Sequence, residues 1–204
     1  MDFVNEKTEE IAKKLLGKKL LVHHDGMWIG GYIVETEAYL GPIDMACHSY
    51  NWKRTPKVES MYQIGGTIYI YMMHSHNMLN IVTKSEGTPE AVLIRALQPT
   101  DNQDILLRHR GVDGFDLSNG PGKLTKALGV TRELDGIMVN EGKILIAEQE
   151  SLIPRNICSS ARIGIPNKGE WTDKSLRFFV EGNPYVSRMS KRSMQEVDET
   201  WKLI

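Results

Sequence analysis

The sequence predicts an α+β fold, in which a curved, mostly antiparallel sheet with the shape of an open barrel is flanked by peripheral helices. Three observations favour this class. Segments with strand character cluster in the first half of the chain, helical segments are short and lie around them, and no repeat or low-complexity tract divides the 204 residues. With 41% apolar residues, the chain can bury one core, so we expect a single domain over 1–204.

Capping and turn signals predict the first elements. Thr8 is followed by two glutamates, two lysines lie near the far end, and Gly17 provides a stop, so we expect a short amphipathic helix capped by Thr8. Residues 19–24 and 28–37 are rich in β-favouring side chains and flank Asp25-Gly26, a strong signal for a tight turn. These two segments therefore predict a β-hairpin.

The next segment, 40–66, is rich in Gly, Pro, Asn and Ser and has no sustained periodicity, which predicts a long irregular loop of the kind that often carries function. In the strand that follows, period-two alternation places Thr67, Tyr69 and Tyr71 on one face, where aromatic rings could meet a ligand. The remaining predicted elements are strands at 67–73, 79–83 and 91–98, helices near 101–109 and 122–128, and strand-like segments at 143–148, 160–165 and 176–181.

Charge and cysteine content narrow the functional class. A formal net charge of −1 argues against wholesale wrapping of nucleic acid, although a local basic surface remains open. Cys47 and Cys158 match neither a disulfide framework nor the spacing of a zinc site. The first residues lack the features of a signal peptide, and no apolar run approaches the ~20 residues of a membrane span. We therefore expect a cytoplasmic protein with no metal and no membrane association.

Two carboxylates and a histidine are the first candidates for chemistry. Glu35 and Glu37 lie two residues apart near a strand end, so both point to one face, and one of them could be a base. A solvated acidic strand face is the alternative. His48 follows eleven residues after Glu37, in a loop that could fold back toward the strand end. Its ring edge would add polar contacts to the stacking faces of the tyrosines, although a locally satisfied loop histidine is equally compatible.

Arg95 lies in an otherwise apolar run, 91–97, that predicts a buried strand. A buried guanidinium needs an anionic partner, which is either a structural ion pair or the carboxylate of the site. Farther along, Pro121 stands at a helix entry with Lys123 and Lys126 close by, an arrangement that suits phosphate as well as an ordinary helix cap.

Taken in order, these segments resemble the alkyladenine (3-methyladenine) DNA glycosylase family. Each segment is weak alone, but their order and spacing together are specific, and the likeness spans about residues 8 to 188. The segments that carry it are 34–42, His48, 55–56, 66–71, Asn80, 94–97, 119–124, 161–164, 169–171 and 176–178.

The resemblance implies an enzyme of base excision repair that needs no cofactor. It would bind double-stranded DNA, flip out an alkylated or deaminated purine such as 3-methyladenine, and hydrolyse the N-glycosidic bond to leave an abasic site. No lysine stands in a motif position that would form a Schiff base, which predicts a monofunctional glycosylase. We expect the protein to act as a monomer.

The resemblance also implies roles for pocket residues. Glu37 would be the general base that activates a water, with Arg95 and the backbone carbonyl of Ile163 as the other groups that hold this water. Tyr39 and Tyr71 match the aromatic residues that sandwich the flipped base.

Two further positions match residues that contact the base. His48 matches the residue that packs on the base and hydrogen-bonds to it. Asn80 matches the asparagine that clashes with the exocyclic amino group of normal guanine.

The match breaks at the predicted hairpin tip. The family usually has a tyrosine there that wedges into the space left by the flipped nucleotide, whereas this chain is one residue shorter between Tyr71 and Asn80. His74 occupies the nearest equivalent place, and Met73 is the other candidate for the wedge. The expected contacts to the DNA backbone, assigned by motif neighbourhood, are Lys53, Arg54, Thr55, Lys123 and Lys126.

Two functions from other classes stay open. A hydrolase of free nucleosides could use the same carboxylate and aromatic residues without any duplex. A non-catalytic module could bind damaged DNA and release nothing, although the presence of both Glu37 and Arg95 argues against it.

Overall fold

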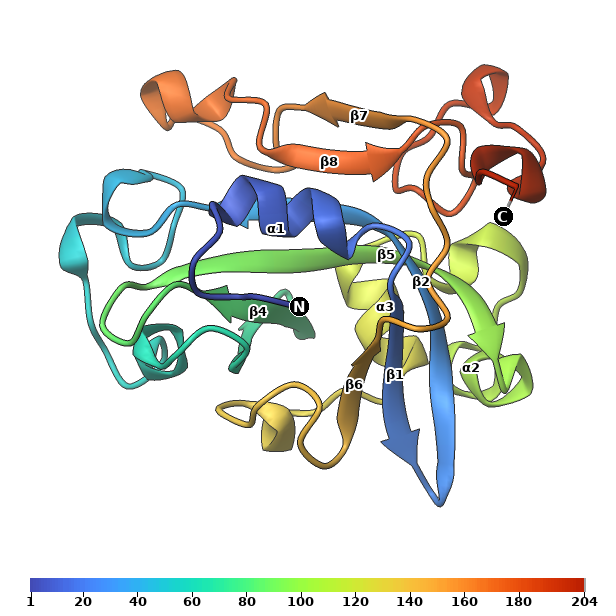
Figure 1. Cartoon of the computed structure of the whole chain (residues 1–204), viewed down its shortest axis with the longest axis horizontal. Helices are drawn as coiled ribbons and strands as arrows, with labels where there is room; N and C mark the ends of the chain where they lie inside the picture. Colours follow the sequence, from blue (N-terminus) through green and yellow to red (C-terminus); the bar gives the residue numbers. More distant parts are fainter. Residues whose placement is uncertain (204) are drawn as a thin grey trace.

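The β-rich segments form one antiparallel sheet in the computed structural model, which describes residues 1–203 (Figure 1). The main path of this sheet is β3-β4-β5-β2-β1-β6, and β8 pairs with both β2 and β7. The sheet curls into a half-barrel. Its strands are β1 (Lys19–His24), β2 (Met27–Tyr39), β3 (Ile68–Met73), β4 (His76–Thr83), β5 (Glu90–Asp101), β6 (Ile144–Ala147), β7 (Ile157–Ser160) and β8 (Arg177–Val180).

The helices within residues 1–203 pack around this sheet. α1 (Thr8–Leu15) crosses in front of the sheet in Figure 1 and contacts β2 and β5. α2 (Gln103–Arg110) and α3 (Pro121–Ala127) pack on each other, and α3 also packs on β4 and β5. The prediction of an α+β fold with a curved, mostly antiparallel sheet is confirmed. None of the helices in the described part of the chain is long and apolar enough to cross a membrane.

Most predicted elements are present with small changes of boundary. The β1–β2 turn has positive φ angles at Asp25 and Gly26, as a tight hairpin turn requires. The segment 40–66 is irregular apart from short 3-10 turns. The expected strands at 143–148 and 176–181 correspond to β6 and β8, and the two expected helices correspond to α2 and α3.

The prediction that Thr8 caps the first helix is wrong. Lys7 occupies the cap position, and Thr8 is the fully buried first residue of α1. The Thr8 hydroxyl hydrogen-bonds the Thr83 hydroxyl at 2.7 Å and the Glu90 carboxylate. Thr8 therefore ties α1 to the sheet, because its hydroxyl finds partners on β4 and β5 instead of the free amides of the helix.

The strand predicted at 160–165 is also wrong in its position. β7 ends at Ser160, and the chain then leaves the sheet. The Arg162 side chain is drawn inward to Asp44, and Gly164 has a φ of +77°, which a regular strand does not adopt. This departure matters for the site, because the segment after Ser160 closes one wall of a pocket.

The pairing of β2 with β5 is irregular where the charged residues lie. The register shifts between Ile33 and Glu35, and again between Glu35 and Thr36. At the second shift the pairing passes over Arg95 on β5. Such bulges bend a strand and change the direction of its side chains, and they are common beside active sites.

Close approach of backbones explains a glycine in the same strand. A Cβ atom at Gly31 would lie 2.0 Å from the carbonyl oxygen of Gln98 on β5. Only glycine fits there without moving the neighbouring strand. A side chain at position 31 would therefore push β2 and β5 apart, and these two strands carry Glu37 and Arg95.

Candidate active site

A cavity of about 240 Å³ opens on the face of β2–β5 that turns away from α1. Alternation explains its lining, because each strand sends every second side chain to this face. The irregular loop and the segment after β7 supply the other walls. The lining includes Tyr39, Tyr69, Tyr71, Met78, Asn80, Leu93 and Arg95 from the strands, and Cys47, His48, Met61, Ile163, Gly164 and Ile165 from the loops.

Glu37 is fully buried directly behind this lining, in contact with three of the lining residues. The backbone N–H of Ile163 donates to its Oε1 at 2.8 Å, and the Tyr39 hydroxyl donates to its Oε2 at 2.8 Å. The guanidinium of Arg95 is 3.2 Å from Oε1. The interpretation of a solvated acidic strand face is therefore wrong, and the structure brings Glu37, Tyr39, Arg95 and Ile163 together.

Glu35 is buried as completely, but it faces a different set of partners. Its Oε1 accepts hydrogen bonds from Arg95 Nε at 2.8 Å, Arg177 Nε at 2.7 Å and the Ser187 hydroxyl at 2.8 Å. Its Oε2 accepts from the Ser187 N–H at 2.8 Å. Arg95 thus bridges two carboxylates. Of the two partners that the sequence analysis left open for Arg95, both are present: a structural ion pair with Glu35 and a contact with Glu37 at the pocket.

The two carboxylates are expected to differ in pKa because of these partners. Burial raises the pKa of Glu37 above its ordinary range, and the attraction of Arg95 offsets only part of that effect. For Glu35, burial acts in the same direction, but Arg95 and Arg177 outweigh it and lower the pKa. Glu37 is therefore the better proton acceptor of the two.

Aromatic rings surround the open part of the cavity. His48 packs edge-on against Tyr71 with ring centroids 4.5 Å apart, and its Nδ1 is 2.9 Å from the Tyr69 hydroxyl. Burial, helped by the charge of Lys53, lowers the pKa of His48, which favours the neutral form of its ring. Burial raises the pKa of Tyr71 to about 12. The pocket thus brings together the aromatic faces and polar edges that the sequence analysis assigned to His48 and the tyrosines.

Arg162 and Asp44 form a buried ion pair that the sequence analysis did not find. Both side chains are fully buried, and Arg162 NH2 donates to Asp44 Oδ1 at 2.8 Å. The guanidinium also lies 4.6 Å from the ring centroid of Tyr39. This pair fixes the segment that supplies the Ile163 amide and supports Tyr39 from the side. Asp44 and Arg162 are 118 residues apart, so no local pattern could have linked them.

The β3–β4 hairpin places the two predicted wedge candidates at the mouth of the cavity. His74 and Ser75 form its tip, both with positive φ, and His74 is exposed. Met73 is 44% exposed and also lines the cavity. Asn80 is buried below them, where its amide donates to the carbonyl oxygens of Tyr69 and Met78.

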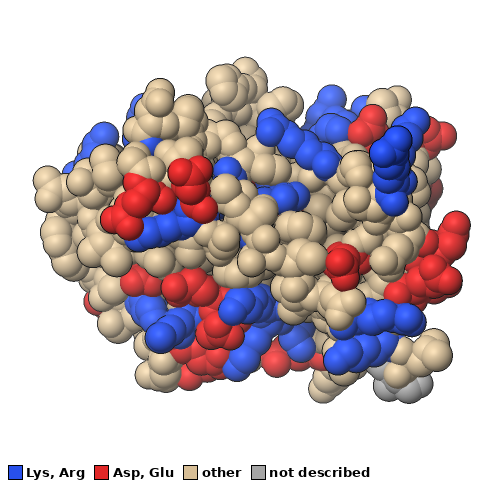
Figure 2. Space-filling model, turned by 90° about the horizontal axis from the view of Figure 1, so that it is seen from above, with Lys and Arg blue, Asp and Glu red and all other residues tan. Residues whose placement is uncertain are grey.

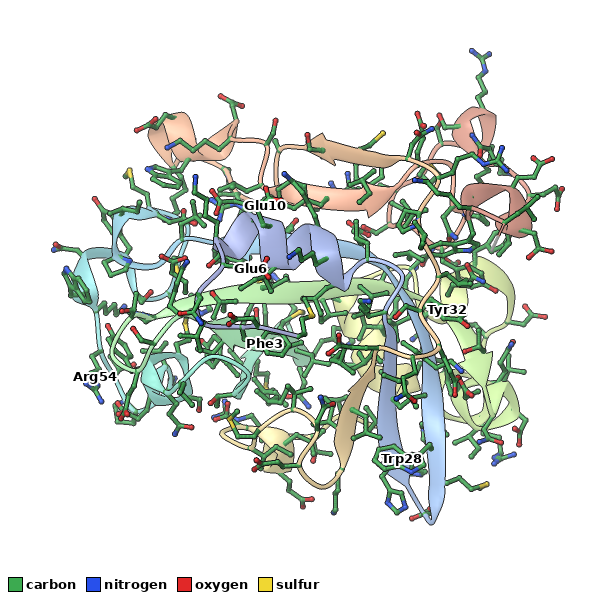
Figure 3. The ribbon with its side chains drawn as sticks, in the orientation of Figure 1. Phe3, Glu6, Glu10, Trp28, Tyr32 and Arg54 are labelled. Atoms are coloured by element: carbon green, nitrogen blue, oxygen red, sulfur yellow. The ribbon has the colours of Figure 1, made fainter. Side chains whose placement is uncertain are left out.

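The basic residues predicted at the DNA backbone lie in two regions. Lys53 and Thr55 line a second, larger cavity of about 710 Å³ that shares His48 and Tyr71 with the first, together with Lys57 and Lys168, which the sequence analysis missed. Arg54 lies at the edge of the molecule (Figure 3), where its guanidinium is 4.6 Å from the ring centroid of Tyr62. Acidic and basic side chains are otherwise interspersed over the surface seen from above (Figure 2).

The predicted basic residues also differ in their partners. Arg54 pairs with Glu59. Lys123, at the entry of α3, is 2.8 Å from Asp116. Lys126 is exposed in the last turn of α3. No group of three or more His, Cys, Asp or Glu side chains within residues 1–203 is arranged to hold a metal ion.

This fold and this site define an α+β protein with an aromatic cavity beside a buried carboxylate–guanidinium pair. The model of the family described as methylpurine-DNA glycosylase (MPG) matches residues 2–184, and the chain belongs to this family.

Curated relatives match along the whole chain. A protein of Staphylococcus saprophyticus is 53% identical over 203 residues, which cover 100% of both chains. A protein of Staphylococcus carnosus is 54% identical, with 99% of this chain and 98% of the relative covered. One from Staphylococcus aureus is 52% identical over 99% and 100% of the two chains. Each bears the name "Putative 3-methyladenine DNA glycosylase".

Proposed function

We propose that this protein is a DNA-repair glycosylase that hydrolyses the N-glycosidic bond of alkylated purines, such as 3-methyladenine, in double-stranded DNA. The observation that carries the proposal is the buried pair of Glu37 and Arg95, 3.2 Å apart, with Arg95 lining an aromatic cavity. Membership of the methylpurine-DNA glycosylase family and the names of the relatives support the choice of DNA as substrate.

Base flipping follows from the position of this pair. A stacked base in a duplex cannot reach a carboxylate buried behind the wall of such a cavity, so the nucleotide has to leave the helix. The cavity of about 240 Å³ is large enough for one base and too small for a base pair with its backbone. Unstacking costs a few kcal/mol and costs least at damaged pairs, which favours lesions before any contact with the pocket.

In this mechanism Glu37 acts as the general base. It accepts a proton from a water that Arg95 and the carbonyl of Ile163 help to hold, and its negative charge stabilises the oxocarbenium-like sugar. The water then attacks the sugar carbon, the base leaves, and an abasic site remains. Because water is the nucleophile, the enzyme is monofunctional and does not cut the strand.

The aromatic pocket selects the lesion. Tyr39 and Tyr71 sandwich the base, and cation–π attraction of about 0.5–2 kcal/mol favours a positively charged alkylated purine. A neutral His48 packs on the base and hydrogen-bonds to it without repelling that charge. Asn80 stands where the exocyclic amino group of guanine would clash. Deaminated purines are neutral and gain less from the pocket, so they are the slower substrates.

The DNA duplex is held by the hairpin tip and the basic residues around the mouth. His74, with Met73 beside it, fills the space that the flipped nucleotide leaves. Lys53, Arg54, Thr55, Lys123 and Lys126 contact backbone phosphates. Arg54 and Lys123 already have carboxylate partners, Glu59 and Asp116, so their phosphate contacts are weaker than that of Lys53.

The central test measures base release from a duplex that contains one 3-methyladenine, with wild-type protein and Glu37→Gln. We expect the wild type to release the base, and the variant to lose about 10²–10⁴-fold in rate, the usual contribution of a general base. Glu10→Gln on the surface of α1 is a matched control that keeps the wild-type rate. A Glu37→Gln variant of full activity would refute the role of Glu37.

The same assay separates the two rival functions. Turnover of a free nucleoside without duplex would indicate a nucleoside hydrolase. Binding of damaged duplex without release of base would indicate a binding module.

A further pair of variants identifies the wedge. His74→Ala should slow release from duplex DNA and spare release from single-stranded DNA, and Met73→Ala should have the smaller effect.

A further inference from the structure

Behind the pocket, four charged side chains alternate in sign from Glu37 through Arg95 and Glu35 to Arg177. Arg95 is 3.2 Å from Glu37 and 2.8 Å from Glu35, and Arg177 is 2.7 Å from the same oxygen of Glu35. The glutamate side chains are 0% exposed, Arg95 is 6% exposed and Arg177 is 11% exposed. With water nearly excluded, each charge acts strongly on its neighbours.

Glu35 has no direct access to a substrate. Three donors occupy its Oε1, and the Ser187 N–H occupies its Oε2. Of its three partner residues, only Arg95 lines the 240 Å³ cavity. All three partners of Glu37, namely Tyr39, Arg95 and Ile163, line it. Any effect of Glu35 on the reaction therefore passes through Arg95, which contacts both Glu35 and Glu37.

Building on the proposed function, we propose that Glu35 is a positioning residue for the reaction: it fixes the Arg95 guanidinium with one N–H group turned to Glu37, and it takes up part of the positive charge that Glu37 would otherwise receive. Without Glu35, Arg95 would serve Glu37 alone and would stabilise its ionised form, which makes a weaker base. Arg177 acts in the opposite direction, because it neutralises Glu35 and leaves more of the charge of Arg95 for Glu37.

The groups that face Glu37 come from several elements. They are Arg95 from β5, Glu35 and Tyr39 from β2, Tyr71 from β3, and the Ile163 amide and Arg162 from the segment after β7. Glu35 and Arg162 lie outside the pocket lining, as does Arg177, the second guanidinium partner of Glu35. Changes at Glu35 and Arg177 therefore alter the charge that Glu37 experiences without removing a side chain that lines the pocket.

Two charge-removing variants, Glu35→Gln and Arg177→Gln, test this inference on the full chain. The primary measurement is the pH titration of the Glu37 carboxyl carbon by ¹³C NMR, assigned by its loss in Glu37→Gln. It needs no DNA and no activity. Matched controls remove one exposed charge of the same sign: Glu10→Gln, whose side chain is 51% exposed, and Arg108→Gln, at 64%.

We expect opposite shifts of the Glu37 titration. Glu35→Gln should lower the midpoint by about one pH unit, and Arg177→Gln should raise it by a similar amount, as expected for one buried charge at short range. Both controls should leave it unchanged. The pH profile of single-turnover base release should follow the titration. Its acidic limb should move to lower pH in Glu35→Gln and to higher pH in Arg177→Gln. The plateau rate should also fall in Glu35→Gln.

A purely structural role for Glu35 predicts a different result. Thermal melts would then show loss of stability while the Glu37 midpoint stays at its wild-type value, and this outcome, or shifts in the same direction for both variants, would overturn the inference. If Glu35→Gln does not fold, Arg177→Gln decides alone. Absence of base release by the wild type would refute the proposed function, whereas the NMR titration would still decide the coupling of Glu35 to Glu37.

Discussion

Glu35 and Glu37 lie two residues apart on β2, point toward the same arginine and are both fully buried, yet their surroundings differ. Glu35 has two guanidinium partners and both polar groups of Ser187, which together satisfy its charge. Glu37 has one guanidinium, one amide and one hydroxyl, and these neighbours border a cavity. The difference teaches that burial alone does not set the direction in which the pKa of a carboxyl group shifts: the number of opposite charges beside it decides.

The largest expected effect separates the two carboxylates by stability. Glu35→Gln should lower the free energy of unfolding by about 3–5 kcal/mol, because it removes the shared anion of two buried guanidinium groups. Glu37→Gln should cost only about 1–2 kcal/mol, since Arg95 keeps Glu35 as its partner. Urea unfolding of both variants at neutral pH measures the two values. Equal decreases in the free energy of unfolding would show that the two carboxylates contribute equally to stability.

The pH dependence of base release sharpens the same contrast. Glu37 has to be ionised to accept a proton, and its pKa is raised by burial above the ordinary value of 4.5. The rate should therefore fall about tenfold for each pH unit below a midpoint that lies above 4.5. A pH profile of single-turnover release from a 3-methyladenine duplex measures this midpoint. A rate that stays constant down to the ordinary range of glutamate would contradict the role of Glu37 as the base.

The pH dependence of stability should have opposite signs at the two positions. The lowered pKa of Glu35 means that its stabilisation is present above pH 4.5 and is lost as the pH falls through the lowered value. The raised pKa of Glu37 means that its contribution is full below pH 4.5 and is lost as the pH rises through the raised value. Each slope is at most about 1.4 kcal/mol per pH unit.

Urea unfolding across the acidic range, with Glu35→Gln and Glu37→Gln beside the wild type, separates these contributions. Glu35→Gln should unfold with a weaker loss of stability toward low pH, and Glu37→Gln should change the slope in the other direction. Changes of the same sign in both variants would contradict the assignment of the two pKa shifts.

The smallest expected effect concerns the hydroxyl that separates Glu37 from the open cavity. Tyr39→Phe removes the hydrogen bond to Oε2 but keeps the aromatic ring, so we expect a stability cost of about 1 kcal/mol. The pKa of Glu37 should rise further, because that hydroxyl supports its ionised form. The acidic limb of base release should accordingly move to higher pH. An unchanged limb would show that Tyr39 acts through its ring alone.

The fold was predictable to the extent that its signals are local. Alternation and turn residues predict β1, β2 and β3, and the Asp25-Gly26 turn is found where the sequence indicates it. The errors arose where tertiary partners override local preference. The Thr8 hydroxyl bonds to the sheet instead of capping α1, and the chain after Ser160 leaves the sheet because Arg162 pairs with Asp44.

The candidate site was predictable in its residue types and less so in its connections. Arg95 could be selected because a guanidinium stands out in an apolar strand, and alternation indicated that Tyr69 and Tyr71 share a face. The roles of Glu37 and Tyr39 came from the family resemblance. The contacts of Arg177 and Ser187 with Glu35 depend on pairings of β2 with β8 and the segment beyond it, 142 and 152 residues away. A single sequence carries no local sign of such pairings.

These long sequence separations have a consequence for how the protein reaches its native state. The ion pair of Asp44 with Arg162 closes a loop of 118 residues, and the bonds to Glu35 close still longer ones. Contacts of this kind carry a large entropic cost before they yield any stabilisation, and they slow folding. The hairpins of β1–β2 and β3–β4 can therefore form early, whereas the pocket is complete only after the last third of the chain has docked. An intermediate that lacks this docking would hold most of the sheet and none of the assembled site.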